Sequence, residues 1–278
     1  MVARNNVVAA RHDIALRMRQ FVLELIVFGI KQAKASLFGG LLLAFMLLTT
    51  AVDLPYFHRY DYIFVFAIVV QILLLAFKLE TRREMLVIFG FHLVATIMEL
   101  YKTSDLIGSW NYPEQASIAI FGVPLFAGFM YSAVGSYIAR AWKLQRLRFE
   151  NYPALIHTYV LALLIYVNFF THHFIWDIRY LLVVYAAVIF WRTRVCFTVI
   201  AERKMPLLLG FSLVSFFVWI AENVATFANV WLYPSQHAGW THVSPNKLGA
   251  WFLLIIVSFV LVSLLYRRSL RPSELERV

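Results

Sequence analysis

Residues 90–115 read GFHLVATIMELYKTSDLIGSWNYPEQ, and residues 210–236 read GFSLVSFFVWIAENVATFANVWLYPSQ. Both stretches open with Gly-Phe-x-Leu-Val. Both continue with Glu-x-x-x-Thr and then with Trp-x-Tyr-Pro-x-Gln. Chance matches between apolar residues are common in an apolar chain, but ordered matches of acidic, aromatic and proline residues are not. The sequence therefore predicts an internal duplication.

The match continues on both sides of these stretches, at an offset of 120 or 121 residues. The paired positions are Arg59-Tyr60 with Arg179-Tyr180, Phe77 with Phe197, Arg83 with Arg203, Met85 with Met205, Pro124 with Pro245, and Gly128 with Gly249. The apolar runs described below give each copy four predicted membrane-spanning helices. Because this number is even, both copies enter the membrane in the same direction. We therefore predict parallel repeats related by a pseudo-two-fold axis along the membrane normal.

The composition is typical of a membrane protein. Hydrophobic residues make up 62% of the chain and charged residues 14%, against about 45–50% and about 25% in a soluble domain. A spanning helix needs roughly 20 mainly apolar residues, and such runs lie at about 36–54, 60–79, 84–101, 116–139, 153–175, 179–200, 205–228 and 248–266. We predict an all-α integral membrane protein of about eight transmembrane helices, arranged as two parallel four-helix repeats.

The net charge of +10 follows the predicted membrane topology. If the N-terminus is cytoplasmic, the outer loops contain only four of the 25 Lys and Arg residues, namely Arg59, Lys102, Arg179 and Lys247. This distribution obeys the positive-inside rule and places both termini in the cytoplasm. The basic clusters at 140–148 and 267–271 are then expected to face anionic lipid headgroups, and no nucleic-acid partner is expected.

Four segments follow from this topology. Residues 1–34 form a cytoplasmic segment, and its apolar stretch at 21–30 is too short to cross a membrane. We expect that stretch to lie in an interfacial amphipathic helix. Residues 35–145 and 146–266 form the first and second four-helix repeats, and residues 267–278 form a cytoplasmic basic tail.

Glu99 and Glu222 are the best candidates for catalytic residues. Each lies on an otherwise apolar predicted helix, where an ionised side chain costs at least about 2.5–3.5 kcal/mol unless it is paired or hydrated. Residues four apart share one helix face, so Thr103 and Thr226 are expected beside the two carboxylates. His92 lies seven residues before Glu99 on the same face. We include Thr103, Thr226 and His92 in the candidate catalytic set.

A structural alternative is that each carboxylate forms an ion pair with the arginine of its own repeat. Arg59-Tyr60 and Arg179-Tyr180 open the second helix of each repeat, on the side where the glutamates lie. Buried ion pairs are often structural, in which case they only hold the helices together. If the carboxylates are functional, these four residues are candidates for substrate binding.

The fifth predicted helix carries a polar stripe that the first lacks. Asn168 and His172 are four residues apart, and His157 lies on nearly the same face. We regard Asn168 and His172 as substrate-binding candidates. His172, His173 and Asp177 also lie together near the outer end, but no HExxH or HxxHH spacing occurs. We therefore assign no metal ligand. Two alternatives stay open for these residues: a bound metal ion, and a hydrogen bond to a neighbouring helix.

Aromatic residues of the two matched loops are expected at the membrane interface. Trp110, Tyr112, Trp231 and Tyr233 have the amphipathic rings that are enriched there. Their repeated order with proline and glutamine indicates a shaped loop folded over the helix ends. We therefore count these four as substrate-binding candidates as well.

Residues 92–115 (HLVATIMELYKTSDLIGSWNYPEQ) carry a family resemblance, together with FFTHHFIWDIRYLL at 169–182, FWRTRVCFT at 190–198 and AENVATFANVWLYPSQHAGW at 221–240. They resemble the YoaT-like family of uncharacterised bacterial multi-pass membrane proteins. The resemblance covers nearly the whole chain. It implies a protein of the bacterial cytoplasmic (inner) membrane, and it implies no particular activity.

A second resemblance is more distant and partial. A helix-borne glutamate followed by Trp-x-Tyr and then Pro-Leu is similar to the membrane-embedded carotenoid (lycopene) cyclase domains, which also occur as tandem repeats. Those domains continue from Pro-Leu into two glutamates, whereas Pro124-Leu125 is followed here by Phe126-Ala127. This resemblance implies chemistry on an isoprenoid.

Three functions remain open. The first is an enzyme that modifies an isoprenoid or other lipid, with Glu99 or Glu222 as proton donor to a carbon–carbon double bond and aromatic faces stabilising the cation. The second is a proton-coupled transporter of a small cation or amine, and the third is a lipid-binding protein without turnover. The expected partners are membrane lipids, among them an isoprenoid or other lipophilic ligand. The residues name no cofactor and no oligomeric state.

The predicted topology can be tested with reporter fusions. Fusions at Glu150 and Ser235 are expected to report opposite sides of the membrane, because three predicted spans separate these positions. Reports from the same side would contradict the arrangement of eight spans.

Overall fold

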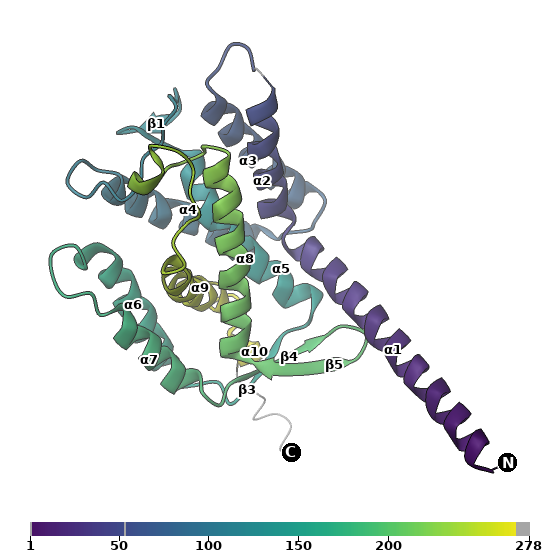
Figure 1. The fold of residues 1–278 in the computed structure, drawn as a ribbon. Helices are drawn as coiled ribbons and strands as arrows, with labels where there is room; N and C mark the ends of the chain where they lie inside the picture. The colour runs from purple at the N-terminus through teal and green to yellow at the C-terminus, as the bar shows by residue number, and fades with distance from the viewer. Residues whose placement is uncertain (1, 53, 271–278) are drawn as a thin grey trace.

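The computed structural model describes residues 2–52 and 54–270, and the chain is mostly helical (Figure 1). The helices are α1 (Val2–Ala35), α2 (Leu37–Ala51), α3 (Arg59–Ala76), α4 (Arg82–Lys102), α5 (Phe126–Leu144), α6 (Leu155–Thr171), α7 (Arg179–Phe190), α8 (Leu207–Phe227), α9 (Lys247–Ser263) and α10 (Arg267–Leu270). A short 3₁₀ turn, η1, covers Pro234–Gln236. Each apolar run identified in the sequence overlaps one of the helices α2 to α9.

Three helices are long and apolar enough to cross a membrane, namely α3, α4 and α8. Helices α1 and α2 meet at a bend of 72° and together make a fourth candidate span. Helices α6, α7 and α9 are apolar but shorter. With 12 residues, α7 is about 18 Å long, against about 30 Å of bilayer hydrocarbon. The described residues thus contain three or four candidate spans.

Two small antiparallel sheets correct the prediction of an all-α fold. Strands β1 (Ala119–Ile120) and β2 (Val123–Pro124) form a hairpin before α5. Strands β3 (Arg148–Glu150), β4 (Arg194–Thr198) and β5 (Glu202–Pro206) form a sheet in the order β3-β4-β5. The predicted helix at 116–139 therefore begins only at Phe126, and the one at 179–200 ends at Phe190.

Charged pairs across the three-stranded sheet explain why the helical prediction failed there. Lys204 pairs with Glu150 at 2.5 Å, and Arg148 pairs with Glu202. Val195 and Cys196 lie on the inner part of the same sheet and are buried. Strand pairing therefore places the charged side chains of this region in solvent. If the helix had continued, Arg192 and Arg194 would have been charged residues on an otherwise apolar helix.

The basic cluster at 140–148 does not face outward as a unit. Arg140 is buried, and its guanidinium donates hydrogen bonds to the backbone carbonyl of Lys34 at 2.6 and 3.0 Å. Arg148 is exposed and pairs within the sheet. The expectation that this cluster faces lipid headgroups is therefore wrong for Arg140. Most of the predicted basic tail, residues 271–278, lies outside the described residues.

The capping of α4 fixes the position of Glu99. The Thr81 hydroxyl accepts a hydrogen bond from the Glu84 N–H, and the Glu84 carboxylate accepts one from the Thr81 N–H. This capping box sets where the helix begins. The helix then runs to Lys102, so Glu99 lies in its last turn, next to the loop that carries the first Trp-x-Tyr-Pro motif.

Helix α5 is central to the packing, because it contributes to both hydrophobic cores. One core includes Trp142 and Ile138 of α5 with residues of α6 to α9. The other includes Phe126 and Phe129 of α5 with residues of α2 and α3. At Gly128, helices α4 and α5 approach so closely that an added Cβ would lie 2.5 Å from Nδ1 of His92 and 2.8 Å from its backbone oxygen.

This close approach gives a testable difference between two glycines that the sequence comparison pairs. Gly128→Ala is expected to lower stability by about 1–3 kcal/mol, because the backbone of α4 must shift. Gly249→Ala is the matched control, since nothing lies within 4 Å of its added Cβ. It should be neutral or should gain up to about 1 kcal/mol in helix propensity. Thermal unfolding of the detergent-purified variants measures both, and equal effects would contradict the packing described.

Candidate functional site

Glu99 is surrounded by neutral hydrogen-bond donors. Its side chain is fully buried. Oε2 accepts hydrogen bonds from the Trp110 indole at 2.9 Å and the Tyr112 hydroxyl at 2.7 Å, and Oε1 accepts one from the Tyr131 hydroxyl at 2.7 Å. Trp110 and Tyr112 come from the loop after α4, and Tyr131 comes from α5. The Glu99 side chain therefore joins two helices and the loop between them.

Glu222 on α8 is held in a similar way. Oε1 accepts a hydrogen bond from the Tyr233 hydroxyl at 2.5 Å, and Oε2 accepts one from the Trp251 indole at 2.6 Å. Burial, followed by the neighbouring Glu222 carboxyl group, raises the pKa of Tyr233 well above its ordinary value, so the phenol stays protonated and can donate. An indole N–H can only donate. At least one oxygen of each carboxyl group therefore acts as an acceptor.

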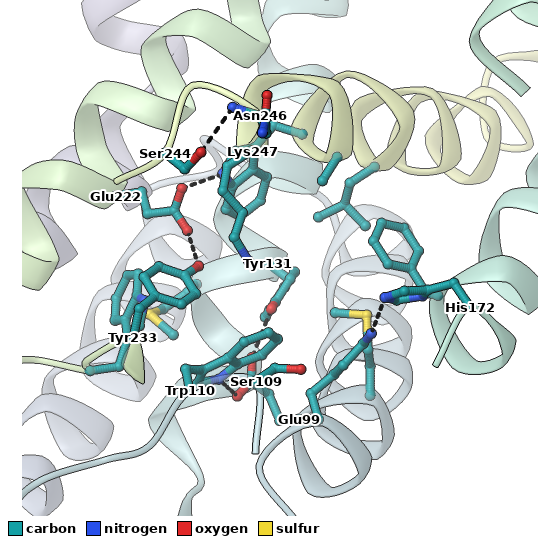
Figure 2. A pocket seen from close by; sticks show the side chains of 18 of the residues that line it. Glu99, Ser109, Trp110, Tyr131, His172, Glu222, Tyr233, Ser244, Asn246 and Lys247 are labelled. Atoms are coloured by element: carbon teal, nitrogen blue, oxygen red, sulfur yellow. Dashed lines mark hydrogen bonds between the residues drawn. The ribbon is translucent and has the colours of Figure 1, made fainter. Parts of the chain in front are cut away.

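Both carboxyl groups lie in the wall of one cavity of about 240 Å³ (Figure 2). Helices α4, α5, α8 and α9 and the two Trp-x-Tyr-Pro loops supply most of its wall, and α6 and α7 close one side. Its apolar and aromatic lining includes Met98, Met130, Phe169, Trp231, Ala250 and Leu254. The fold thus brings the two glutamates, 123 positions apart in sequence, to the wall of one cavity.

Lys102 lines the same cavity and contacts two imidazoles. Its Nζ lies 2.8 Å from Nε2 of His173. The same Nζ lies 3.4 Å from Nε2 of His172, which Figure 2 shows at the side of the cavity. Partial burial, and then the Lys102 ammonium, lowers the pKa of His173 to about 4. Both imidazoles are therefore acceptors for the ammonium near neutral pH.

Lys247 enters the cavity from the first residue of α9 and lies against aromatic rings. Its Nζ is 4.2 Å from the ring centre of Tyr233 and 5.7 Å from that of Trp110. In Figure 2 this side chain reaches into the middle of the cavity, between Glu222 and Trp110. Arg179 also lines the cavity and pairs with Asp177 at 3.2 Å.

The structural alternative, in which each glutamate pairs with the arginine of its own repeat, is wrong. Arg59 pairs with Glu114 at 2.6 Å and donates to backbone carbonyls. Arg179 pairs with Asp177. In the described part of the chain, neither Glu99 nor Glu222 forms a salt bridge, because tyrosine and tryptophan donors occupy the places expected for the arginines.

The predicted carboxylate–hydroxyl pairs do not form. The Thr103 hydroxyl donates to the backbone carbonyl of Glu99 at 2.7 Å. The Thr226 hydroxyl donates to the carbonyl of Asn223 and accepts from the Trp240 indole. A helical threonine can turn its hydroxyl back to a backbone carbonyl, and this local bond replaces the expected one.

His92 lies apart from the cavity. Its ring packs against Phe129 at 4.4 Å between ring centres and stands beside Gly128. Its buried Nδ1 has no hydrogen-bond partner among the described residues. His92 therefore belongs to the α4–α5 packing contact and not to the site.

The remaining candidates divide between the cavity and other places. Tyr60 donates to the carbonyl of Val230 at 2.8 Å and packs beneath the loops, while Tyr180 is exposed. Asn168 donates to Asp177 at 3.1 Å and accepts from the Ile178 N–H, which fixes the turn after α6. The candidates in the cavity wall are Glu99, Glu222, Trp110, Tyr112, Trp231, Tyr233, His172 and Arg179.

Four residues of the site escaped the sequence analysis as site residues. Tyr131 and Trp251 donate to the two carboxyl groups. At the offset of 121 that pairs Gly128 with Gly249, Tyr131 is matched with Phe252 and Trp251 with Met130, so the internal comparison did not single them out. Lys102 and Lys247 were recognised only as outer basic residues. Nothing in their sequence context indicates that they point into a cavity.

Metal binding finds no support in the geometry around His172 and His173. Among the described residues, no group of three or more His, Cys, Asp or Glu side chains is placed to hold a metal ion. The two Nε2 atoms instead face the Lys102 ammonium.

Fold and site together define a mostly helical protein with apolar helices of membrane-spanning length and a buried two-carboxylate cavity. Residues 24–259 match a family described as "Protein of unknown function (DUF817)". The chain is also 42% identical to "Uncharacterized protein YoaT" of Bacillus subtilis (strain 168) over 241 residues, which is 86% of this chain and 90% of that protein. The chain therefore belongs to this YoaT-like family, as the sequence motifs indicated. The likeness to carotenoid cyclase domains stays a prediction, and no solved structure matches the chain.

The His173 pKa gives a pH prediction. The unfolded chain binds a proton at this histidine near about pH 6.5, whereas the folded protein does so only near about pH 4. Between these values the unfolded state holds more protons, so His173 makes stability fall as the pH is lowered from 6.5 to 4.

The measurement is the melting temperature between pH 7 and pH 4.5. His173→Gln should reduce its pH dependence, and His58→Gln, in an exposed position, serves as the control. An unchanged slope in His173→Gln would contradict the contact with Lys102.

Proposed function

We propose that this chain is a multi-pass protein of the bacterial cytoplasmic (inner) membrane with about eight crossings and both termini in the cytoplasm. The apolar helices and the distribution of Lys and Arg support this topology. The three long spans and the bent α1–α2 pair would supply part of the crossings. The shorter helices α6, α7 and α9 would supply others by packing inside the bundle. The N-terminal part of α1 would lie at the cytoplasmic interface.

We further propose that α2–α5 and α6–α9 are the two copies of one parallel repeat. The helix contacts support this arrangement: α4 packs on α5 as α8 packs on α9, and α2 on α3 as α6 on α7. Asn111 and Leu232 occupy matched positions of the two Trp-x-Tyr loops and exchange backbone hydrogen bonds of 3.0 and 2.9 Å. A reciprocal contact between equivalent residues is what a two-fold axis requires.

The function that we propose is the modification of an isoprenoid or other lipid in the cavity. The observation that carries it is the placement of two buried carboxyl groups in one mainly apolar and aromatic space. Such a space excludes water and suits a lipophilic ligand. A carboxyl group there can transfer a proton to a carbon–carbon double bond, and nearby aromatic faces can stabilise the resulting cation.

The proton balance of this reaction requires no further reagent. A carboxylic acid gives its proton to one alkene carbon, and a carboxylate then removes a proton from a neighbouring carbon of the cation. Glu222 is the better candidate for this exchange, because two donors contact it against three for Glu99. It therefore keeps more free lone pairs. Glu99 would chiefly hold the aromatic wall in place.

A second candidate function is transport of a small cation or amine, coupled to protons. The position of Lys247 favours it, since its ammonium lies on the faces of Tyr233 and Trp110 beside Glu222. A ligand amine could take the same place. A protein that binds lipid without turnover is the third outcome that the experiment below distinguishes.

The test compares the lipids that co-purify with the wild type and with Glu222→Gln. Both Glu222→Gln and Glu99→Gln should fold, because the amide oxygen can still accept from the indole N–H. Mass spectrometry is expected to find a lipophilic molecule in both proteins, with the unmodified form accumulating in Glu222→Gln. Loss of a general acid typically slows a reaction by about 10²–10⁴-fold.

Glu114→Gln is the matched control, since Glu114 is an outer-loop acid that pairs with Arg59 outside the cavity. If all variants co-purify with identical lipids, the protein binds lipid without turnover. If no lipid co-purifies and proteoliposomes take up an amine in a Glu222-dependent way, the transporter proposal is supported and the enzyme proposal is rejected.

A further inference from the structure

Three cations lie in the wall of the cavity, and each occupies the end of a helix. Lys102 is the last residue of α4, and Arg179 and Lys247 are the first residues of α7 and α9. The N-termini of α7 and α9 add the positive ends of two helix dipoles to the charges of their own side chains. The cavity wall therefore contains a positive region, to which both side-chain charges and helix dipoles contribute.

Among the described residues, Arg179 is the one cation of the three with an acid at short range, Asp177 at 3.2 Å, whereas Glu99 and Glu222 pair with none of them. The hydrogen bonds to Glu99 and Glu222 come from neutral tyrosine and tryptophan side chains. Within the described part of the chain, neither Lys102 nor Lys247 has an acidic side chain within salt-bridge distance. Lys102 is only 4% exposed, and burying an ammonium without a counter-charge is costly. An anionic ligand would offset that cost.

Neutral partners hold the cations in place without using all of their donors. The Lys102 ammonium has three N–H groups, and His172 and His173 accept from two of them. Lys247 rests on aromatic faces, so its N–H groups have no oxygen acceptor among the described side chains. Both lysines thus keep hydrogen-bond donors for a ligand that enters the cavity.

We propose that Lys102, Arg179 and Lys247 form a subsite for a phosphate group. This inference rests on the proposed function and deepens it, because it names the lipid as one with a phosphate head. A phosphate monoester carries a charge of about −1.5 to −2 at neutral pH and three acceptor oxygens. That charge and those acceptors match three cations and two helix N-termini better than a single carboxylate does.

The arrangement also orients the ligand. In Figure 2, His172, the partner of Lys102, lies on the opposite side of the cavity from Glu222 and Tyr233. The phosphate would bind on the side of Lys102, across the cavity from Glu222. The hydrocarbon part would then lie along the aromatic wall, within reach of Glu222.

The test uses the full-length protein in detergent and four probes: farnesyl monophosphate, farnesol, palmitate and inorganic phosphate. Binding is followed by the fluorescence of the cavity tryptophans or by calorimetry. Lys102→Gln and Lys247→Gln should each weaken farnesyl monophosphate binding by about 10-fold or more, because each removes a charge-assisted hydrogen bond. Farnesol binding should stay unchanged in both variants. Lys204→Gln, on the exposed strand β5, removes the same charge at the other end of the molecule and should change neither.

Each outcome decides the proposal. Equal affinity of the wild type for farnesyl monophosphate and farnesol would overturn the phosphate subsite and leave the lipid cavity standing. If the wild type binds neither farnesyl monophosphate nor farnesol, both the phosphate subsite and the lipid cavity are overturned. Competition by inorganic phosphate that Lys247→Gln abolishes would support the subsite with free phosphate as its source. Palmitate binding as tightly as farnesyl monophosphate would overturn the choice of phosphate over carboxylate. If Lys102→Gln fails to fold, Lys247→Gln decides alone, since its cation lies on ring faces and holds no helix contact.

Discussion

The hydrogen bonds from neutral aromatic donors to Glu99 and Glu222 are the interaction on which the arrangement of the site depends. A carboxyl group on an apolar helix must find donors, and here tyrosine and tryptophan supply them. Each set of donors comes from the following loop and the following helix. The two carboxyl groups therefore fix the loops over the helix ends and at the same time define the shape of the cavity. Arginine partners would have neutralised the acids and filled the space.

Charged side chains have different kinds of partner at the sheet end of the molecule and in the cavity. At the end with β3-β4-β5, acids and bases pair directly, as in Lys204 with Glu150 and Lys143 with Glu84. At the other end, Arg59 pairs with Glu114 and Arg179 with Asp177. The cavity acids Glu99 and Glu222, in contrast, accept from neutral donors, and Lys102 and Lys247 contact neutral acceptors or ring faces. The cavity end thus has the character of a binding site, and the sheet end has the character of a scaffold.

The asymmetry between the matched halves also bears on function. Glu99 has three donors and Glu222 has two, and the two lysines do not occupy matched positions. Gly128 lies in close contact with His92, whereas Gly249 has open space around it. The differences in the cavity wall, in the donors to the two glutamates and in the positions of the two lysines, suit a ligand with two unlike ends.

The sequence by itself determined the apolar helical class, the position of nearly every helix, the family and the two buried glutamates, because hydropathy and residue type act locally along the chain. It could also place the tyrosines and tryptophans in ordered loops. It mistook the ends of two helices. At 194–206 two strands replace the predicted helix, and strand β4 pairs with β3, whose residues lie more than 40 positions away in sequence. The partners of Glu99 and Glu222, the turning of Thr103 and Thr226 to the backbone, and the entry of Lys102 and Lys247 into one cavity were decided only by tertiary structure. The physical reason is that a side chain's partner depends on which helices pack together, and residue spacing within a helix carries no information about that.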